Sequence, residues 1–416
     1  MITKQSSRKA KILIIVQNLS VPFDRRVWRE CQALREAGYA ISVICPKGAA
    51  HDQLAYEKIE EISIYRYPMY QSKGGFLSYL IEYAVALVMT TWLLLRVYRR
   101  HGFEVIQICN PPDLLILPVL PFKLLGKKFV FDQHDLCPEI YQAQRPHVAG
   151  DSWVLKALFL FERMTYRFSD VVMVVNESCR KIALTRGRKP DRDVFVVRNG
   201  PSISNIRGTQ PNIDLKQEKN YLLVYVGMMG PQEGIDIMLR AIKHLCLRDR
   251  LEDFHVRIIG GGTVLDEMKR YAEELGITHL VTFTGHLDHK RVMESIASAD
   301  VCLCPDPKTP LNDKCSMAKA IEYMSLGRPF VCFDLEEVRN CAGDAALYAV
   351  PNEEIDFAEK IHILLEDAQM RSDLGAIGRE RVLRFLAWDH SKPALLTAYE
   401  RVLGVEQAGH LEKDPI

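Results

Sequence analysis

The chain has 416 residues, of which 48% are hydrophobic and 26% charged, with 24 glycines and 20 prolines. This ordinary globular composition excludes a wholly disordered chain, a collagen-like repeat and a disulfide-stabilised miniprotein, and the length predicts two domains. The net charge is +1, so no global nucleic-acid signature exists and no nucleic-acid partner is expected.

The charge is divided unevenly between the halves. Residues 1–205 hold 29 Lys and Arg against 19 Asp and Glu, a net charge of +10, whereas residues 206–416 hold 25 against 34, a net charge of −9. A basic half favours an anionic partner, such as a membrane surface or a phosphorylated ligand. A chance distribution of solvated charges explains the asymmetry equally well.

The eleven cysteines include no CxxC pair, and Cys302 and Cys304 have the spacing of same-face neighbours on a strand. No second pair of ligands accompanies them, so we expect reduced thiols in a cytoplasmic protein, with no metal and no cofactor. The first residues lack the apolar core of a secretory signal, so none is expected.

Short apolar runs alternate with helical stretches along the first half. A loop with Pro22 and a helix over 26–37 follow the first run, and a helical stretch before Gly126 separates two later ones. Buried parallel strands have this near-continuous apolar character. The predicted strands are Lys11–Gln17, Ala40–Cys45, Glu104–Cys109, Lys128–Asp132, Val171–Val175 and Val194–Val197.

The second half repeats the alternation after a polar stretch over 200–219, which is typical of an interdomain linker. The predicted strands are Tyr221–Val226, His255–Ile259, Val281–Phe283, Val301–Cys304 and Pro329–Phe333, and the predicted helices cover 236–247, 265–275 and 318–325. Alternating strands and helices predict an α/β chain with two doubly wound Rossmann-like domains, whose ligands bind at the carboxyl ends of the strands, in a cleft between the domains. We expect domains at 1–205 and 206–390, followed by a C-terminal helix and tail at 391–416.

The run Phe76–Leu95 is long enough to span a bilayer and carries one charge, Glu82. Glu82 and the polar Thr90 and Thr91 argue against a spanning helix. If the strands on either side belong to one sheet, both must stay on the same side of a membrane. We therefore expect a helix that packs on the N-terminal domain, with one face at a membrane interface.

The tract Ser316–Pro329 (SMAKAIEYMSLGRP) carries the most chemistry. Ser316 stands where a helix N-cap would, and the free N–H groups of a helix N-terminus suit a diphosphate. Lys319 and Glu322 are three residues apart and therefore neighbours on one helix face. From chemistry alone, a surface ion pair explains this spacing as well as a nucleotide site does.

The same tract resembles the donor-binding segment of glycosyltransferase family 4, whose members have the GT-B fold, and the resemblance covers nearly the whole chain. It implies that Glu322 holds the donor ribose. Further matching tracts in the C-terminal half are VYVGMMG at 224–230, RIIGGG at 257–262 and the segment at 379–388. In the N-terminal half they are PFDRRVW at 22–28, NPPD at 110–113, FDQHDLCPE at 131–139 and VRNGP at 197–201, which resemble a bacterial surface-polysaccharide branch of the family.

The chain departs from the family pattern at the expected phosphate ligands. Lys314 stands eight residues before Glu322, where the family often has an acid, and Asp313 is the nearest substitute. The usual Arg and Lys of the first loop of the C-terminal domain are missing. The remaining candidates for the nucleotide sugar are Gly227, Gly230 and Gly261 with their backbone, Ser316, Lys319 (also a catalytic candidate) and Arg198.

His134 and Asp135 follow a predicted strand, so a cleft position is expected. The resemblance implies that His134 lies beside the donor sugar, and both residues are catalytic candidates. On the acceptor side the candidates are Arg25, Arg26 and Asn110. Surface pairing of the arginines with Asp24 and Glu30 is the competing interpretation.

The resemblance implies a retaining glycosyltransferase. It would move a sugar from a nucleotide diphosphate sugar to a lipid-linked or growing polysaccharide acceptor, at the cytoplasmic face of the plasma membrane. Front-side attack would let the departing diphosphate take the acceptor's proton, so catalysis would rest on charge stabilisation and positioning. The alternative is a non-catalytic GT-B subunit that activates a partner transferase. A dehydrogenase is disfavoured, because no GxGxxG opens a helix after the first strand.

Overall fold

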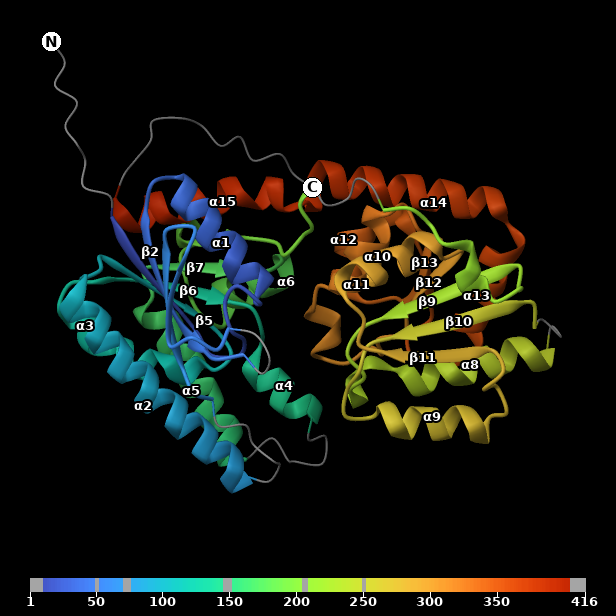
Figure 1. Cartoon of the computed structure of the whole chain (residues 1–416), viewed down its shortest axis with the longest axis horizontal. Coiled ribbons are helices and arrows are strands. Elements are labelled where there is room, and N and C mark those ends of the chain that lie inside the picture. The colour runs from blue at the N-terminus through green and yellow to red at the C-terminus, as the bar shows by residue number, and fades with distance from the viewer. Residues whose placement is uncertain are drawn as a thin grey trace, which may run out of the picture. The chain divides into compact units, whose positions relative to one another are not determined.

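The computed structural model describes residues 10–48, 52–69, 76–144, 152–203, 209–248 and 252–404 (Figure 1). Internal contacts divide the chain into two compact units. The first unit contains Met1–Tyr141, Val148–Val197 and Lys392–Ile416, and the second contains Gln142–His147 and Arg198–Ser391.

The first unit is built on an eight-stranded sheet in the order β3-β4-β2-β1-β5-β6-β7-β8. Among the described strands of this sheet, β3 alone is antiparallel to its neighbour. The strands are β1 (Lys11–Val16), β2 (Ala40–Pro46), β3 (Tyr56–Ile59), β4 (Ile62–Tyr67), β5 (Val105–Cys109), β6 (Lys128–Gln133), β7 (Val171–Val174) and β8 (Val194–Val196). The helices are α1 (Arg25–Glu36), α2 (Phe76–Arg100), α3 (Ile116–Leu124), α4 (Cys137–Gln144), α5 (Trp153–Phe168) and α6 (Glu177–Thr185).

The second unit holds a six-stranded parallel sheet in the order β11-β10-β9-β12-β13-β14. Its strands are β9 (Tyr221–Val226), β10 (Phe254–Ile259), β11 (Val281–Gly285), β12 (Val301–Cys304), β13 (Phe330–Phe333) and β14 (Ala346–Ala349). Its helices are α8 (Ile235–Arg248), α9 (Leu265–Glu274), α10 (His289–Ser298), α11 (Ala318–Ser325), α12 (Glu336–Ala342), α13 (Glu354–Glu366) and α14 (Ala368–Arg381). The last helix, α15 (Trp388–Leu403), begins in the second unit, and from Lys392 onward it belongs to the first.

Every strand predicted from the sequence is present, with ends at most two residues from the predicted ones, and α11 has the predicted bounds. The prediction omitted β3, β4 and β14. These strands lie at or next to a sheet edge, where the apolar pattern is shorter or more polar. The predicted linker forms a 3-10 turn at Ile213–Lys216, and its residues 204–208 lie outside the described part of the chain.

The long apolar run forms α2, and Ile81–Arg100 has the length and composition of a membrane span. The strands on either side of this helix, β4 and β5, belong to the same sheet. The helix packs on β2, β4 and α3. Because one spanning helix would place β4 and β5 on opposite sides of a bilayer, α2 does not cross a membrane.

Candidate active site

In the first unit, the loops after β5 and β6 are joined by Asn110. Its side-chain oxygen accepts hydrogen bonds from the backbone N–H groups of His134 (2.7 Å) and Asp135 (3.2 Å). Its amide nitrogen donates to the backbone oxygen of Asp135 (2.8 Å) and to the Asp113 carboxylate (3.0 Å). Asn110 is 1% exposed, so this amide fixes where the His134 side chain begins.

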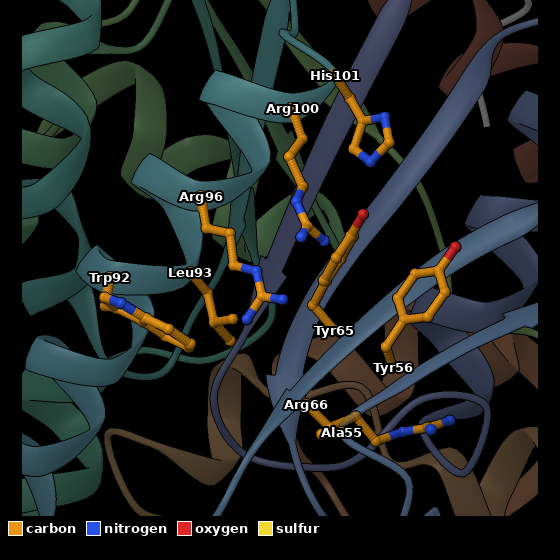
Figure 2. A pocket seen from close by; sticks show the side chains of 9 residues that line it. All are labelled: Ala55, Tyr56, Tyr65, Arg66, Trp92, Leu93, Arg96, Arg100 and His101. Carbon is orange, nitrogen blue, oxygen red and sulfur yellow. The ribbon is translucent and has the colours of Figure 1, made fainter.

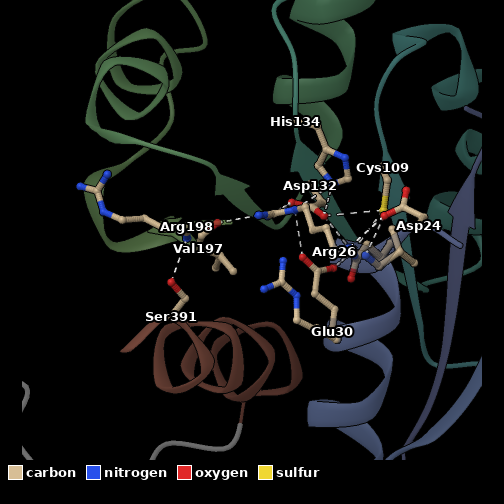
Figure 3. A network of polar contacts seen from close by, with 12 residues as sticks. Asp24, Arg26, Glu30, Cys109, Asp132, His134, Val197, Arg198 and Ser391 are labelled. Carbon is tan, nitrogen blue, oxygen red and sulfur yellow. Dashed lines mark hydrogen bonds and ion pairs between the residues drawn. The ribbon is translucent and has the colours of Figure 1, made fainter. Parts of the chain in front are cut away.

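The His134 imidazole is held by a buried carboxylate of the preceding strand. Its Nε2 lies 2.6 Å from Asp132 Oδ2, and Arg26 Nη2 donates to Asp132 Oδ1 (2.7 Å) (Figure 3). Burial lowers the pKa of His134, but the Asp132 charge raises it more, so its pKa lies above the ordinary value. The Asp132 charge therefore favours the protonated imidazole, whereas the Arg26 guanidinium, whose Nε lies 3.0 Å from His134 Nε2, opposes it.

A second carboxylate, Glu30, completes this network. Its Oε1 lies 3.2 Å from Arg26 Nε, and its Oε2 accepts from Gln107 Nε2 (2.8 Å). Burial, together with the Asp132 charge, raises the pKa of Glu30 to about 7. Gln107 also accepts a hydrogen bond from the Tyr399 hydroxyl of α15. Gln107 Nε2 also donates to Asp132 Oδ2 (3.2 Å), so Gln107 connects the C-terminal helix to the carboxylate that holds His134.

In the second unit, Lys319 is the centre of an ion cluster. Its Nζ lies 2.7 and 2.8 Å from the two oxygens of Asp306 and 3.0 Å from Glu233 Oε2, and it lies 5.0 Å from the centre of the Tyr225 ring. Burial lowers the pKa of Lys319, but the neighbouring anions, with Asp306 foremost, raise it well above its ordinary value. The lysine is therefore a buried cation held by two carboxylates.

The loops that follow β9 and β10 pack backbone against backbone. The Gly227 N–H donates to Ile259 O (3.0 Å), and Met229 N–H donates to Gly261 O (2.8 Å). Gly260 has φ +134°, and a Cβ there would lie 1.9 Å from Gly227 O, so only glycine fits. A Cβ on Gly227 would itself lie 3.3 Å from Lys319 Cε. These glycines permit close packing of the loops around the lysine.

Two family models match the chain. The model described as Glycosyltransferase Family 4 matches residues 24–204, and the model described as Glycosyl transferases group 1 matches residues 207–381. Together they account for most of both units. The chain belongs to the family 4 glycosyltransferases.

Known proteins of similar sequence and fold agree with this assignment. The 2-deoxystreptamine glucosyltransferase of Streptomyces kanamyceticus is 24% identical over 336 residues, which make up 78% of this chain and 83% of the relative. Sucrose-phosphate synthase of Thermosynechococcus elongatus superposes with a TM-score of 0.75 at 18% identity, covering 96% of this chain and 100% of that one. Anabaena HepE, solved with UDP and glucose, gives 0.69 at 16% identity, covering 94% and 99%. The fold is GT-B, as the resemblance implied.

Several expected ligands of the glycosyltransferase are used in other ways. Ser316 is not the N-cap of α11: Met317 is, without a side-chain cap. The Gly227 N–H already donates to Ile259 O, so it does not offer a free donor to a diphosphate. Asp313 accepts from the backbone N–H of Glu336 (2.8 Å) and lies 3.4 Å from Lys308 Nζ, so its carboxylate holds the start of α12.

The predicted cations also have partners. Arg26 is 5% exposed and also donates to Val197 O (2.7 Å), so the expectation of an acceptor-facing guanidinium is wrong for this residue. Arg25, next to it, is exposed. Arg198 lies 3.6 Å from Glu337 Oε1, and its backbone N–H donates to Ser391 Oγ (3.1 Å) (Figure 3). Arg25 is the predicted acceptor-side cation that the structure leaves at the surface.

Three of the carboxylates that organise the two sites were missed, and the fourth, Glu30, was named only as a surface partner of the arginines. Asp132, Glu30, Asp306 and Glu233 each pair with a cation that was predicted to face a ligand. One signal was available: Asp132 interrupts an apolar strand two residues before His134, and a charge inside a buried strand requires a partner.

The remaining predicted donor-side residues lie near the Lys319 ion cluster. Glu322, one turn after Lys319 on α11, is half-buried, and Gly230 and Gly261 lie in the loops beside the cluster.

Cys109, Asp132 and His134 lie close enough together to suggest a metal site. The guanidinium of Arg26 lies 3.0 Å from His134 Nε2, so a positive charge already occupies this position. Burial and the neighbouring carboxylates raise the pKa of the Cys109 thiol well above its ordinary value. A protonated thiol beside a guanidinium favours an ion-pair network over a metal centre.

Proposed function

We propose that this glycosyltransferase transfers a sugar, with retention of configuration, from a nucleotide diphosphate sugar to a lipid-linked or growing polysaccharide acceptor. The observation that carries the proposal is the family match over both units. The donor assignment is supported by HepE, which was solved with UDP and glucose. The lipid-linked acceptor is supported by the surface of α2, described below.

On the donor side, Glu322 is suited to hold the ribose, because a carboxylate accepts hydrogen bonds from two adjacent hydroxyls. Asp306 and Glu233, fixed by Lys319, offer further acceptors for sugar hydroxyls. In the first unit, His134 is suited to orient the transferred sugar, because Asp132 holds its imidazole. The departing diphosphate takes the proton of the acceptor hydroxyl, so the proposed chemistry requires positioning and charge stabilisation and no protein nucleophile.

Replacing Glu322 with glutamine is expected to weaken donor binding about 10- to 100-fold, because hydrogen bonds to a charged group contribute roughly 1.5–3 kcal/mol. A thermal-shift screen of UDP-, GDP-, ADP- and dTDP-sugars first identifies the donor, since ligand at about 100 times its Kd stabilises by about 2.7 kcal/mol. Calorimetry then compares the wild type with Glu322→Gln and with Glu274→Gln, an exposed control on α9.

Equal donor affinity in wild type and Glu322→Gln would contradict the ribose assignment. Donor binding without transfer to any acceptor would instead identify a non-catalytic subunit that serves a partner transferase.

The proposed membrane contact is an apolar face of α2. Its side chains at Ile81, Val88, Trp92 and Leu95 are 43%, 66%, 50% and 40% exposed. These positions follow one stripe of the helix, whereas Leu94 and other side chains of the opposite face are buried. Exposed apolar residues on an ordinary surface are scattered singly, whereas these form a continuous stripe, which is typical of an interaction surface.

Cations accompany this apolar stripe. Arg96, Arg99 and Arg100 end the helix. The neighbouring α3, which packs on α2 through Tyr98 and Phe122 (ring centres 5.1 Å apart), ends in Leu124, whose side chain is 89% exposed. A helix with apolar and basic groups at its surface binds anionic bilayers in the plane of the interface. We therefore propose peripheral attachment to the inner face of the plasma membrane.

Val88→Asp is expected to lower partitioning onto anionic vesicles about tenfold or more, because one buried aliphatic side chain contributes roughly 1.5–3 kcal/mol. Vesicle flotation measures the effect, and Ile377→Asp on α14, also an exposed apolar residue on a helix, is the control. Equal partitioning of the two variants would contradict the proposal that α2 contacts the membrane.

A further inference from the structure

A cavity of about 570 Å³ lies between the β3–β4 hairpin and the C-terminal part of α2 (Figure 2). It lies apart from His134, which follows the carboxyl end of β6, since this part of α2 leads instead into the start of β5. The residues that line it and carry the inference are Tyr56, Tyr65, Trp92, Arg96, Arg100 and His101.

Two of the cations that line this cavity have no carboxylate beside them among the described residues. Arg66 also lines it, but Arg66 Nη1 lies 2.8 Å from Glu57 and Arg66 Nη2 lies 3.4 Å from Asp52. Within the part of the chain that the structure describes, neither Arg96 nor Arg100 has a carboxylate partner. The two guanidinium groups are one helical turn apart and both turn toward Tyr65 (Figure 2).

Two like charges at this spacing destabilise a helix. The helix dipole favours cations in the last turn, and this offsets part of the cost. It does not explain why both guanidinium groups converge on one cavity. An anion bound between them would explain the convergence, because a phosphate oxygen accepts charge-assisted hydrogen bonds from guanidinium groups.

The walls of the cavity are aromatic. The rings of Tyr56 and Tyr65 lie 5.0 Å apart, and the Arg96 guanidinium lies 5.3 Å from the centre of the Trp92 ring. Trp92 also belongs to the exposed apolar stripe of α2, so the cavity continues into that stripe. The ligand that fits both features has an anionic head and an apolar body.

We propose that this cavity binds the phosphate of an anionic phospholipid headgroup, whose acyl chains lie along the exposed stripe of α2. The inference rests on the membrane attachment proposed above and adds a specific site to it. Trp92 marks the level at which headgroup and acyl region meet, as amphipathic aromatic residues do at membrane interfaces. The bound lipid would fix the depth and rotation of α2 in the interface.

The test compares binding to phosphatidylcholine vesicles with and without phosphatidylglycerol. Arg96→Gln and Arg100→Gln are expected to lower affinity for the phosphatidylglycerol vesicles at least tenfold, because each removes a direct phosphate contact. The control is Arg99→Gln, which removes the same charge from the same helical turn but does not line the cavity. Arg99→Gln should lower the affinity for these vesicles no more than about fivefold, which is the effect of one cation near a charged surface.

Tyr56→Ala, on β3, removes a cavity wall without changing charge or the α2 stripe. It is expected to lower affinity for phosphatidylglycerol vesicles and to leave binding to neutral vesicles unchanged. A parallel arm measures sn-glycerol 1-phosphate by calorimetry in the absence of vesicles. We expect weak or no binding there, because the acyl contacts are missing.

Equal losses from the three arginine variants would overturn the cavity inference and leave only diffuse attraction to the surface. Tight binding of free glycerol phosphate that depends on Arg100 would contradict the proposal that the bound phosphate belongs to a phospholipid. A wild type that binds neither kind of vesicle would overturn the membrane attachment together with this site. The vesicle result does not depend on transferase activity, so loss of the donor assignment would leave it standing.

Discussion

Replacing His134 with alanine is expected to lower turnover about 10²- to 10³-fold while changing nucleoside diphosphate affinity little. Asp132 holds the imidazole at 2.6 Å and raises its pKa above the ordinary value. A prepositioned donor that stabilises developing charge in a transition state contributes roughly 2.7–4 kcal/mol. Steady-state kinetics with the identified donor, together with calorimetry of the nucleoside diphosphate, measure the two effects separately.

His279→Ala is the control for this experiment, because its ring is 54% exposed and its carboxylate partner, Glu252, lies 3.7 Å away. It should retain wild-type turnover. If His134→Ala turned over normally but bound the nucleoside diphosphate poorly, His134 would belong to nucleotide binding instead. We expect the variant to fold, because removing His134 leaves the Arg26–Asp132 pair in place, and circular dichroism measures this.

Replacing Lys319 with alanine is expected to destabilise the second unit by about 3–5 kcal/mol. The change leaves the Asp306 and Glu233 carboxylates close together without their cation, and removing one partner of a buried ion pair carries a cost of this size. Urea unfolding measures the loss. The control is Lys269→Ala on α9, whose ion pair is exposed and should contribute less than about 1 kcal/mol.

The destabilisation of Lys319→Ala should depend on pH. Burial raises the pKa of Glu233 and Lys319 opposes this, so without the lysine Glu233 takes up a proton more readily in the folded chain than in the unfolded chain. A folded pKa raised above the unfolded value gives stability that is present at low pH and lost as pH rises. The difference in unfolding free energy between the variant and the wild type should therefore increase from about pH 4 upward. Adding Asp306→Asn should decrease this difference. A stable variant that loses affinity for UDP but keeps affinity for uridine would instead show direct phosphate contact.

The central strands of both sheets and the position of the strand-end residues were accessible from the sequence, whereas the strand order was not predicted. Buried parallel strands have apolar runs that local pattern identifies, and such strands place Asn110 and His134 at the same edge of one sheet. The helix α11 was likewise predicted, because its apolar face repeats at helical spacing and Gly327 follows its end. These features depend on neighbours a few residues away, so the sequence displays them directly.

Which charges remain available to a ligand was decided by the tertiary structure alone. Arg26 meets Asp132, 106 positions away in the chain, and Lys319 meets Glu233, 86 positions away. A lysine or arginine has the same appearance in a sequence whether it faces solvent or a buried carboxylate. The difference is set by desolvation, because a cation that packing removes from water must acquire an anion, and only the folded chain brings that anion within reach.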